Sequence, residues 1–174
     1  VGNPYQLYFK PVNLFVAGFI GEPPMNFIRT TVHNRCVNIG GSLHDLSLVV
    51  GDQIDKYDGK DIVVGFRPEA ISLGYTDNSF GFTATVELTE LLGDNTNVYV
   101  DMLANKVILK VDPHDTPKID SIITFSVPHK SIYLFDAETE EVPQFIRMEN
   151  PSWEYYAAQT IQSDTKQFEL KIID

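Results

Sequence analysis

The sequence predicts a mainly β fold that begins with two short helices. Apolar and polar residues alternate over residues 80–92, which is the clearest strand signal in the chain. Several shorter runs of the same kind follow, separated by polar turns, and this spacing is typical of a small closed barrel or sandwich. Before residue 27, glycine and proline end two segments that have the length of short helices.

The two helices are predicted from their ends, over residues 3–9 and 14–20. Asn13 can cap the second helix by accepting a hydrogen bond from a free backbone N–H. Gly21 stands where a left-handed residue most easily ends a helix, and the prolines that follow cannot continue it. We therefore expect a small helical entry that redirects the chain into the β region.

The strands are predicted from alternation and from β-branched runs bounded by turn residues. On residues 80–92, one face carries Phe80, Phe82, Ala84, Val86 and Leu88. The polar residues 53–60 are predicted to form a loop, and Gly93-Asp94-Asn95 a turn. In the tail, residues 152–162 have the pattern of a helix and residues 166–173 that of a strand. The full set of predicted strands in the β region is 27–32, 43–50, 62–66, 80–92, 97–103, 107–111, 119–127 and 131–135.

Composition excludes several classes of function. The net charge of −11 argues against a nucleic-acid surface and against docking on anionic lipid. With Cys36 as the only cysteine, no disulfide can form within the chain, which fits a reducing compartment. No apolar run is long enough to span a bilayer. The sequence starts at Val1 rather than at methionine, so we expect it to be a fragment of a longer polypeptide.

No motif for catalysis or cofactor binding is found. The one Gly-Lys pair, Gly59-Lys60, has Ile54 and Asp61 where a phosphate-binding loop needs glycine and Ser or Thr. The four histidines are scattered and none has zinc-ligand spacing with a cysteine. We predict no catalytic, cofactor-binding or metal site in this chain, and no ATPase activity.

Four blocks of residues carry a resemblance to a known family, in the family's own order. The first, residues 15–27, differs from the family pattern only at Glu22, where serine is usual, and the residues before it also match. The second is Gly65-Phe66-Arg67-Pro68-Glu69, the third spans residues 85–96 and the fourth is Ile132-Tyr133-Leu134-Phe135-Asp136. The chain resembles the C-terminal regulatory region of ATP-binding subunits of ABC sugar importers, in the maltose and multiple-sugar branch.

The resemblance implies a TOBE-type barrel related to the oligonucleotide/oligosaccharide-binding (OB) fold. Residues 1–26 would be the helical linker from a missing nucleotide-binding domain, 27–142 the regulatory domain, and 143–174 an extension that matches nothing recognised. ATP and Mg²⁺ would bind in the missing domain, on the cytoplasmic face of the membrane.

The implied partners are a second copy of the subunit, membrane-spanning transporter subunits reached through the missing domain, and a regulatory protein in some relatives; no nucleic acid is expected. Candidate partner-binding residues are Arg67, Pro68, Glu69, Gly93, Asp94 and Asn95. For Arg67 and Glu69 two interpretations stay open, because these charges can hold a corner of the barrel or meet a partner.

An alternative function is a small-ligand module, since related barrels in molybdate-type importers bind an oxyanion and some OB folds bind sugars. An oxyanion needs converging backbone N–H groups, and the turn Gly40-Gly41-Ser42 is the one candidate nest. The strong negative charge disfavours an anion there. No motif supports a free-standing enzyme.

Overall fold

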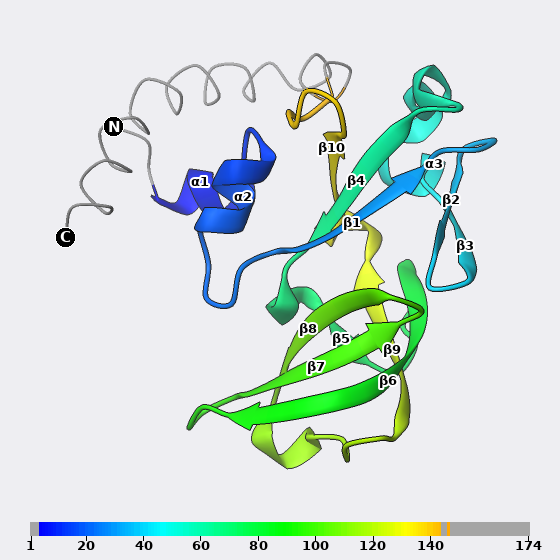
Figure 1. Cartoon of the computed structure of the whole chain (residues 1–174). Coiled ribbons are helices and arrows are strands. Elements are labelled where there is room, and N and C mark those ends of the chain that lie inside the picture. Colours follow the sequence, from blue (N-terminus) through cyan, green and yellow to red (C-terminus); the bar gives the residue numbers. More distant parts are fainter. Residues whose placement is uncertain (1–3, 144–145, 147–174) are drawn as a thin grey trace. The chain divides into compact units, whose positions relative to one another are not determined.

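A computed structural model describes residues 4–143 and 146 (Figure 1). Contacts between Cα atoms divide the chain into two compact units. One unit holds the residues up to Pro24 together with those from Phe135 onward, and the other is Met25–Leu134. The predicted helix over 152–162 and the predicted strand over 166–173 lie outside the described residues. No helix in the described part of the chain is long and apolar enough to cross a membrane.

The first unit contains the two predicted helices, α1 (Pro4–Phe9) and α2 (Leu14–Phe19). The Asn13 side chain caps α2, because its Oδ1 accepts a hydrogen bond from the Val16 N–H at 2.9 Å. Gly21 follows the helix with a φ of 116°, as expected for its place after the cap. A small apolar cluster holds the helices together, formed by Leu7, Val12, Val16 and Ile20.

The returning chain packs on these helices through backbone hydrogen bonds. The Leu14 N–H donates to the Glu140 carbonyl at 2.9 Å, and the Val142 N–H donates to the Val12 carbonyl at 3.2 Å. Segments about 130 residues apart in sequence therefore form one unit.

The β region begins with a small three-stranded sheet and a hairpin (Figure 1). The sheet has the order β1-β4-β10, from β1 (Asn26–Thr31), β4 (Asp61–Phe66) and β10 (Tyr133–Asp136). Strands β2 (Cys36–Ile39) and β3 (Ser42–Asp45) pair with each other as the hairpin. The predicted strands 27–32, 62–66 and 131–135 are confirmed with shifts of one or two residues, while β2 is absent from the predicted set.

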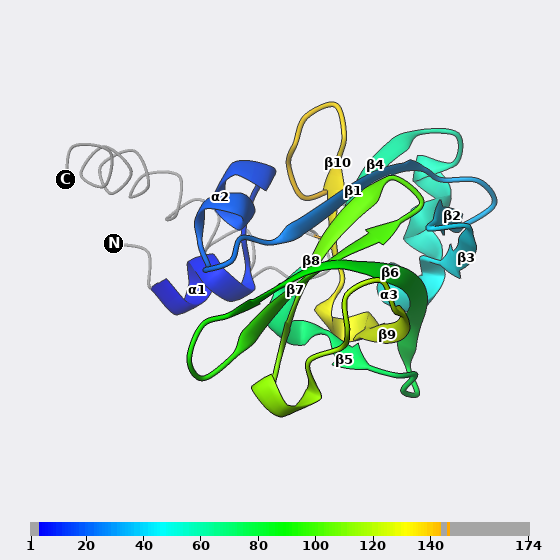
Figure 2. The same cartoon turned by 60° about the horizontal axis from the view of Figure 1, so that its bottom comes forward.

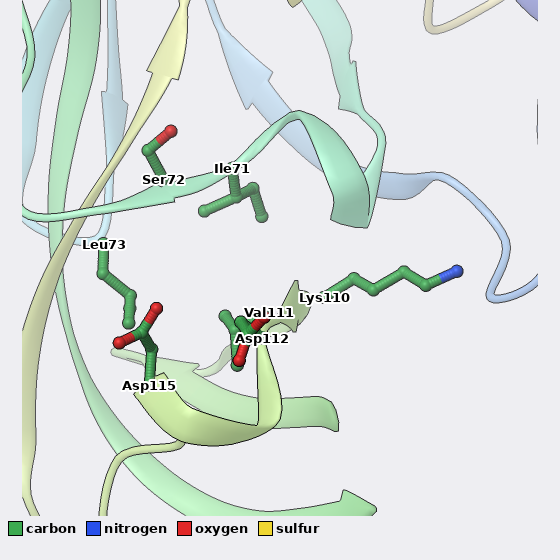
Figure 3. Close-up of a pocket in the computed structure, with 7 residues that line it drawn as sticks. All are labelled: Ile71, Ser72, Leu73, Lys110, Val111, Asp112 and Asp115. Atoms are coloured by element: carbon green, nitrogen blue, oxygen red, sulfur yellow. The ribbon is translucent and has the colours of Figure 1, made fainter. Parts of the chain in front are cut away.

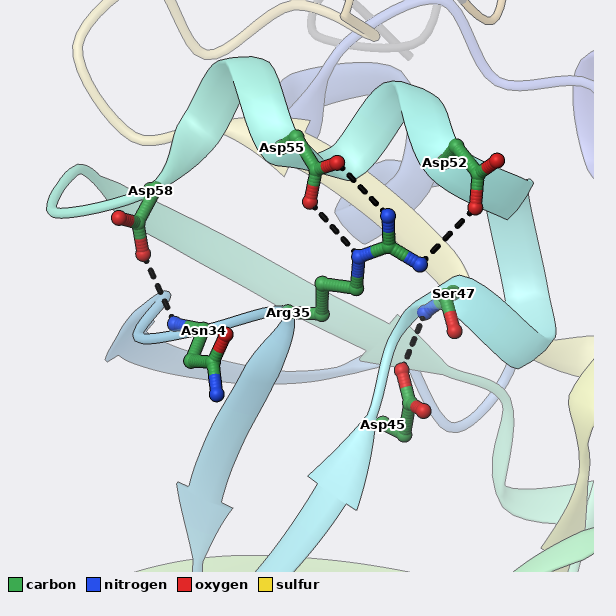
Figure 4. A network of polar contacts seen from close by, with 7 residues as sticks. All are labelled: Asn34, Arg35, Asp45, Ser47, Asp52, Asp55 and Asp58. Atoms are coloured by element: carbon green, nitrogen blue, oxygen red, sulfur yellow. Dashed lines mark hydrogen bonds and ion pairs between the residues drawn. The ribbon is translucent and has the colours of Figure 1, made fainter.

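The predicted strand over 43–50 is wrong in its second half. After β3 the chain forms α3 (Ser47–Val50) and then a 3₁₀ helix, η1 (Gly51–Tyr57), where a loop was predicted. The physical reason is local: the Asp45 carboxylate accepts the Ser47 N–H at 2.9 Å and starts a helical turn (Figure 4). The hydrogen bond from Ser47 also lowers the pKa of Asp45.

Arg35 fixes η1 against the start of β2 (Figure 4). Its Nε and Nη2 each donate to the Asp55 carboxylate at 2.8 Å, and its Nη1 donates to Asp52 at 2.9 Å. In the same region the Asp58 carboxylate accepts the Asn34 N–H at 2.8 Å. These contacts join a turn near residue 35 to a helix about 20 residues later.

The larger sheet of the second unit has five strands in the order β5-β9-β6-β7-β8. Figures 1 and 2 show β6, β7 and β8 side by side as a curved layer, with β9 on the other flank of β6. Strand β5 has two residues and lay outside the predicted set, because alternation cannot be recognised over so short a run. The strands are β5 (Ser72–Leu73), β6 (Ser79–Leu91), β7 (Thr96–Met102), β8 (Asn105–Val111) and β9 (Ile122–Pro128).

The alternation on β6 is confirmed as far as Val86, since Phe80, Phe82, Ala84 and Val86 are buried. The assignment of Leu88 to the same face is wrong, because its side chain is 51% exposed. A β-bulge between Val86 and Leu88 shifts the register with β7. An extra residue at a bulge reverses the face of the side chains that follow it, so Leu88 turns outward.

Candidate interaction surfaces

The first predicted group of site residues lies at the corner where β4 ends. Arg67 has an extended backbone, and Pro68 is the first residue of a short 3₁₀ turn, η2 (Pro68–Ala70). Proline disfavours a helical conformation at Arg67 and fits the start of a helical turn, which explains the sharp corner. Arg67 and Pro68 are buried, with Arg67 only 3% exposed, whereas Glu69 is exposed.

The Arg67 guanidinium shares this corner with Tyr133. Burial lowers the pKa of Arg67, and the charge interaction with Tyr133 opposes that change. Burial also raises the pKa of Tyr133, with Arg67 lowering it and Glu69 raising it further. The three groups therefore lie within electrostatic range of one another. A partner at this corner would meet Glu69, the exposed member of the predicted group.

The second predicted group forms the turn between β6 and β7. Gly93 has a φ of 85°, a value that glycine adopts without steric cost. The Leu92 N–H donates to the Asn95 carbonyl at 2.8 Å and closes the turn, while Asn95 Nδ2 donates to Asp94 Oδ1 at 2.8 Å. Gly93 and Asp94 are exposed.

Exposed leucines and isoleucines lie on the second half of β6, which leads into this turn, and at the start of β9. Thr85 of β6 pairs with Ile122 of β9, and the Asp120 N–H donates to the Val86 carbonyl at 2.8 Å. These contacts place the start of β9 beside the bulged part of β6. The exposed side chains of this surface, here called the hairpin-end surface, are Leu88, Leu91, Leu92, Ile119 and Ile122, with exposures of 47% to 74%.

A groove of about 640 Å³ joins segments that are distant in sequence. Thr76, Asp77, Asn78 and Ser79 supply polar groups from the turn before β6, and Thr76 Oγ1 lies 2.8 Å from Ser79 Oγ. Leu48 and Val49 of α3 supply an apolar side. The remaining lining residues are Pro128, His129 and Lys130. The groove could not be predicted from the sequence, because one of its sides is formed by α3. The apolar pattern of residues 43–50 predicts a strand there instead.

The predicted nest at Gly40-Gly41-Ser42 is the turn of the β2–β3 hairpin. Gly40 and Gly41 have φ values of 60° and 81°. The Gly41 N–H already donates to Asn38 Oδ1 at 3.1 Å, so one of the donors that an anion would need is engaged. A Cβ atom on Gly40 would lie 3.2 Å from Met102 Cβ, so the turn sits against the end of β7.

Two family models match the β region of the chain. Residues 21–71 match the MalK OB fold domain, and residues 64–135 match the TOBE domain. The predicted resemblance and the predicted mainly β, OB-like fold are thereby confirmed.

Curated relatives match over most of this chain. It is 32% identical over 152 residues to the sn-glycerol-3-phosphate import ATP-binding protein UgpC of Psychromonas ingrahamii, covering 81% of this chain and 38% of that protein. It is 35% identical over 152 residues to the uncharacterized ABC transporter ATP-binding protein YurJ of Bacillus subtilis, covering 81% and 41%. The chain thus spans less than half the length of these relatives.

Among solved structures, the cytoplasmic molybdate-binding protein ModG, in its molybdate-bound form, has a similar fold. The TM-score is 0.50 and the sequence identity is 16%, with 68% of this chain and 96% of ModG covered. At this identity the likeness concerns the fold alone.

Proposed function

We propose that this chain holds two ABC importer ATP-binding subunits together during sugar import. The premise is that the chain belongs to the family of regulatory regions that such subunits carry at their C-terminal end. These regions are built from a MalK OB fold domain and a TOBE domain. In this proposal the region has no ATPase activity of its own. ATP and Mg²⁺ bind in a nucleotide-binding domain of the whole subunit, which docks on membrane-spanning subunits at the cytoplasmic face of the membrane.

The proposal is based on the exposed apolar side chains of the hairpin-end surface. Five large apolar side chains are exposed there, and a folded chain gains nothing by holding Leu91 68% exposed to water. Large apolar side chains left exposed along one hairpin and the strand beside it are candidates for an interaction site. A two-fold dimer uses the same patch on both copies, so one apolar surface of this kind is sufficient.

Light scattering of the chain across a concentration series tests this proposal. We expect a reversible rise from the monomer mass toward twice that mass as concentration increases. A constant monomer mass up to the highest soluble concentration would contradict a self-associating region.

A charged substitution locates the contact. Leu91→Glu places a carboxylate in the hairpin-end surface, and we expect it to shift the monomer–dimer midpoint to higher concentration by about tenfold or more. Leu43→Glu is the matched control, because Leu43 is 73% exposed and lies on β3, in the β2–β3 hairpin. Equal effects of the two changes would remove the hairpin-end surface from the proposal.

The small-ligand alternative is favoured by one observation, the groove of about 640 Å³ lined by residues 48–49, 76–79 and 128–130. Side-chain amide, carboxylate and ammonium groups facing an apolar wall suit a polyol or sugar better than a simple oxyanion. Thermal shift against sugars, molybdate and sulfate distinguishes the ligand classes. An increase in Tm with a sugar that Asn78→Ala abolishes would favour the alternative, and no shift with any ligand would exclude it.

A further inference from the structure

A second groove, of about 560 Å³, lies between the two edge strands of the five-stranded sheet (Figure 3). Strand β5 is one edge of the sheet and β8 is the other. Ile71, Ser72 and Leu73 line the groove on one side, and Lys110, Val111, Asp112 and Asp115 line it on the other. The groove is therefore bounded by the unpaired sides of two strands.

The open side of β8 can be derived from Asn26. The Asn26 side chain bonds both the N–H and the carbonyl of Ile108, so these two groups point away from β7. Backbone groups of alternate residues in an antiparallel strand point the same way. The N–H and carbonyl of Lys110 therefore also point away from β7, and neither has a hydrogen-bond partner among the described residues.

The open side of β5 follows in the same way. The N–H of Gly74, the residue that follows β5, donates to the Thr124 carbonyl of β9 at 2.8 Å. Ser72 pairs with Ser126 and lies two residues before Gly74, so the backbone groups of Ser72 and Gly74 both point toward β9. Leu73 lies between them, and its N–H and carbonyl therefore point away from β9. That side is the groove, which Leu73 lines and where its side chain is 37% exposed.

The charged residues that line the groove are two aspartates and one lysine. Asp112 and Asp115 line it, and Oδ1 of Asp112 accepts the His114 N–H at 2.8 Å. Figure 3 shows the Asp115 carboxylate beside the Leu73 side chain, whereas the Lys110 side chain extends away from both. The unpaired backbone groups of a strand edge favour a partner chain in an extended conformation. The carboxylates favour a cationic side chain on that partner.

We propose that this groove binds an extended, basic segment of a partner protein, which adds to the sheet as a short strand. The backbone of the segment bonds the open edge groups at Leu73 and Lys110, and a lysine or arginine side chain meets Asp115. Apolar side chains of the segment contact Ile71, Leu73 and Val111. This mode of recognition takes its affinity from backbone hydrogen bonds and its selectivity from alternate side chains.

Fluorescence anisotropy with a defined probe tests the proposal. The probe is a fluorescein-labelled peptide of alternating lysine, valine and threonine, acetylated and amidated at its ends. Two matched peptides serve as controls: one has glutamate in place of lysine, and one has N-methylated backbone amides. We expect saturable binding of the basic peptide, with at least tenfold weaker binding of both controls. Equal binding of the N-methylated peptide would overturn the strand-addition mode.

Two variants connect binding to the groove. Asp115→Asn keeps the shape of an exposed side chain and removes its charge, and we expect about two- to fivefold weaker binding of the basic peptide. Leu73→Pro removes an N–H that takes no part in the β5–β9 ladder, and we expect near-complete loss of binding, with circular dichroism confirming the fold. Unchanged binding to both folded variants would overturn the proposal. Binding that appears only after deletion of residues 144–174 would assign the groove to this chain's own terminal segment instead.

Discussion

The side-chain amide of Asn26 pairs with the backbone of Ile108 as a neighbouring strand would. Its Nδ2 donates to the Ile108 carbonyl at 2.9 Å, and its Oδ1 accepts the Ile108 N–H at 2.8 Å. Asn26 begins β1 and Ile108 lies in the middle of β8, so one side chain joins the smaller sheet to the edge of the larger one. Asn26 is only 7% exposed, and the two bonds satisfy polar groups that are largely shielded from water.

We predict that Asn26→Ala lowers the free energy of unfolding by about 1–3 kcal/mol, since it leaves the Ile108 groups without partners. Asn26→Asp keeps one acceptor and loses the donor, so its cost should be similar or larger near neutral pH. Urea unfolding measures both. Asn105→Ala, at a partly exposed position with no side-chain hydrogen bond among the described residues, is the control and should cost clearly less. An equal cost would contradict the assigned role of Asn26.

A second prediction concerns the pH dependence that His44 confers. The ring is 6% exposed and packs on Phe80 and Phe82, with centroids 4.9 and 4.7 Å away. Burial lowers its pKa below the ordinary 6.5, an interaction with His129 lowers it further, and a backbone hydrogen bond with Ile39 opposes both. The unfolded chain therefore binds the proton at a higher pH than the folded chain does.

The free energy of unfolding should accordingly fall as pH drops from about 6.5 toward the lower pKa of the folded state. His44→Phe keeps an aromatic ring without a proton to bind and should flatten the curve between about pH 5 and 7. His114→Gln, which removes an exposed histidine from the surface, is the control substitution. Asp45 and Asp61, whose pKa values are lowered, affect stability only in more acidic solution. An unchanged slope in His44→Phe would refute this assignment.

A third prediction is that Arg35 orders η1. Arg35→Lys loses the planar fork that contacts Asp55 through two nitrogens and Asp52 through a third. Hydrogen exchange of the amides over residues 51–57 should become faster, and high salt should reduce the difference because these groups are exposed. Arg29→Lys, which affects a single contact to Asp61 at 3.3 Å, should leave η1 unchanged. Equal exchange in the Arg35 variant and the wild type would contradict this role.

The fourth prediction concerns the β2–β3 turn. Gly40→Ala should cost about 1–2 kcal/mol from its left-handed backbone alone. A further cost should come from the contact with Met102 Cβ at 3.2 Å. A double-mutant cycle with Met102→Ala in thermal unfolding isolates the second term. Full additivity of the two changes would show that the turn does not press on β7.

Alternation alone was enough to predict most of the larger sheet, because β6, β7 and β8 each bury one face. It failed at Leu88, since a bulge changes the pairing without leaving a mark on the apolar pattern. It failed at residues 47–50 because Leu-Val-Val favours a strand while the Asp45 carboxylate, two residues earlier, starts a helix.

The two predicted groups of site residues came from the resemblance, and the structure places each group together, at the β4 corner and at the β6–β7 turn. Neither groove could be predicted. The groove between β5 and β8 depends on how the sheet curls to bring its two edges near each other, which local patterns do not encode. Partner binding at either predicted group stays a prediction.

Crosslinking at the hairpin-end surface tests most directly whether two copies meet there. The variant Cys36→Ser removes the only cysteine, and Asp94→Cys then places a single thiol on the exposed β6–β7 turn. A short bis-maleimide should convert this variant to a covalent dimer in dilute solution, while Asp58→Cys, on an exposed turn before β4, should stay monomeric. Covalent dimers from both variants in equal amount, or from neither, would contradict association through the hairpin-end surface.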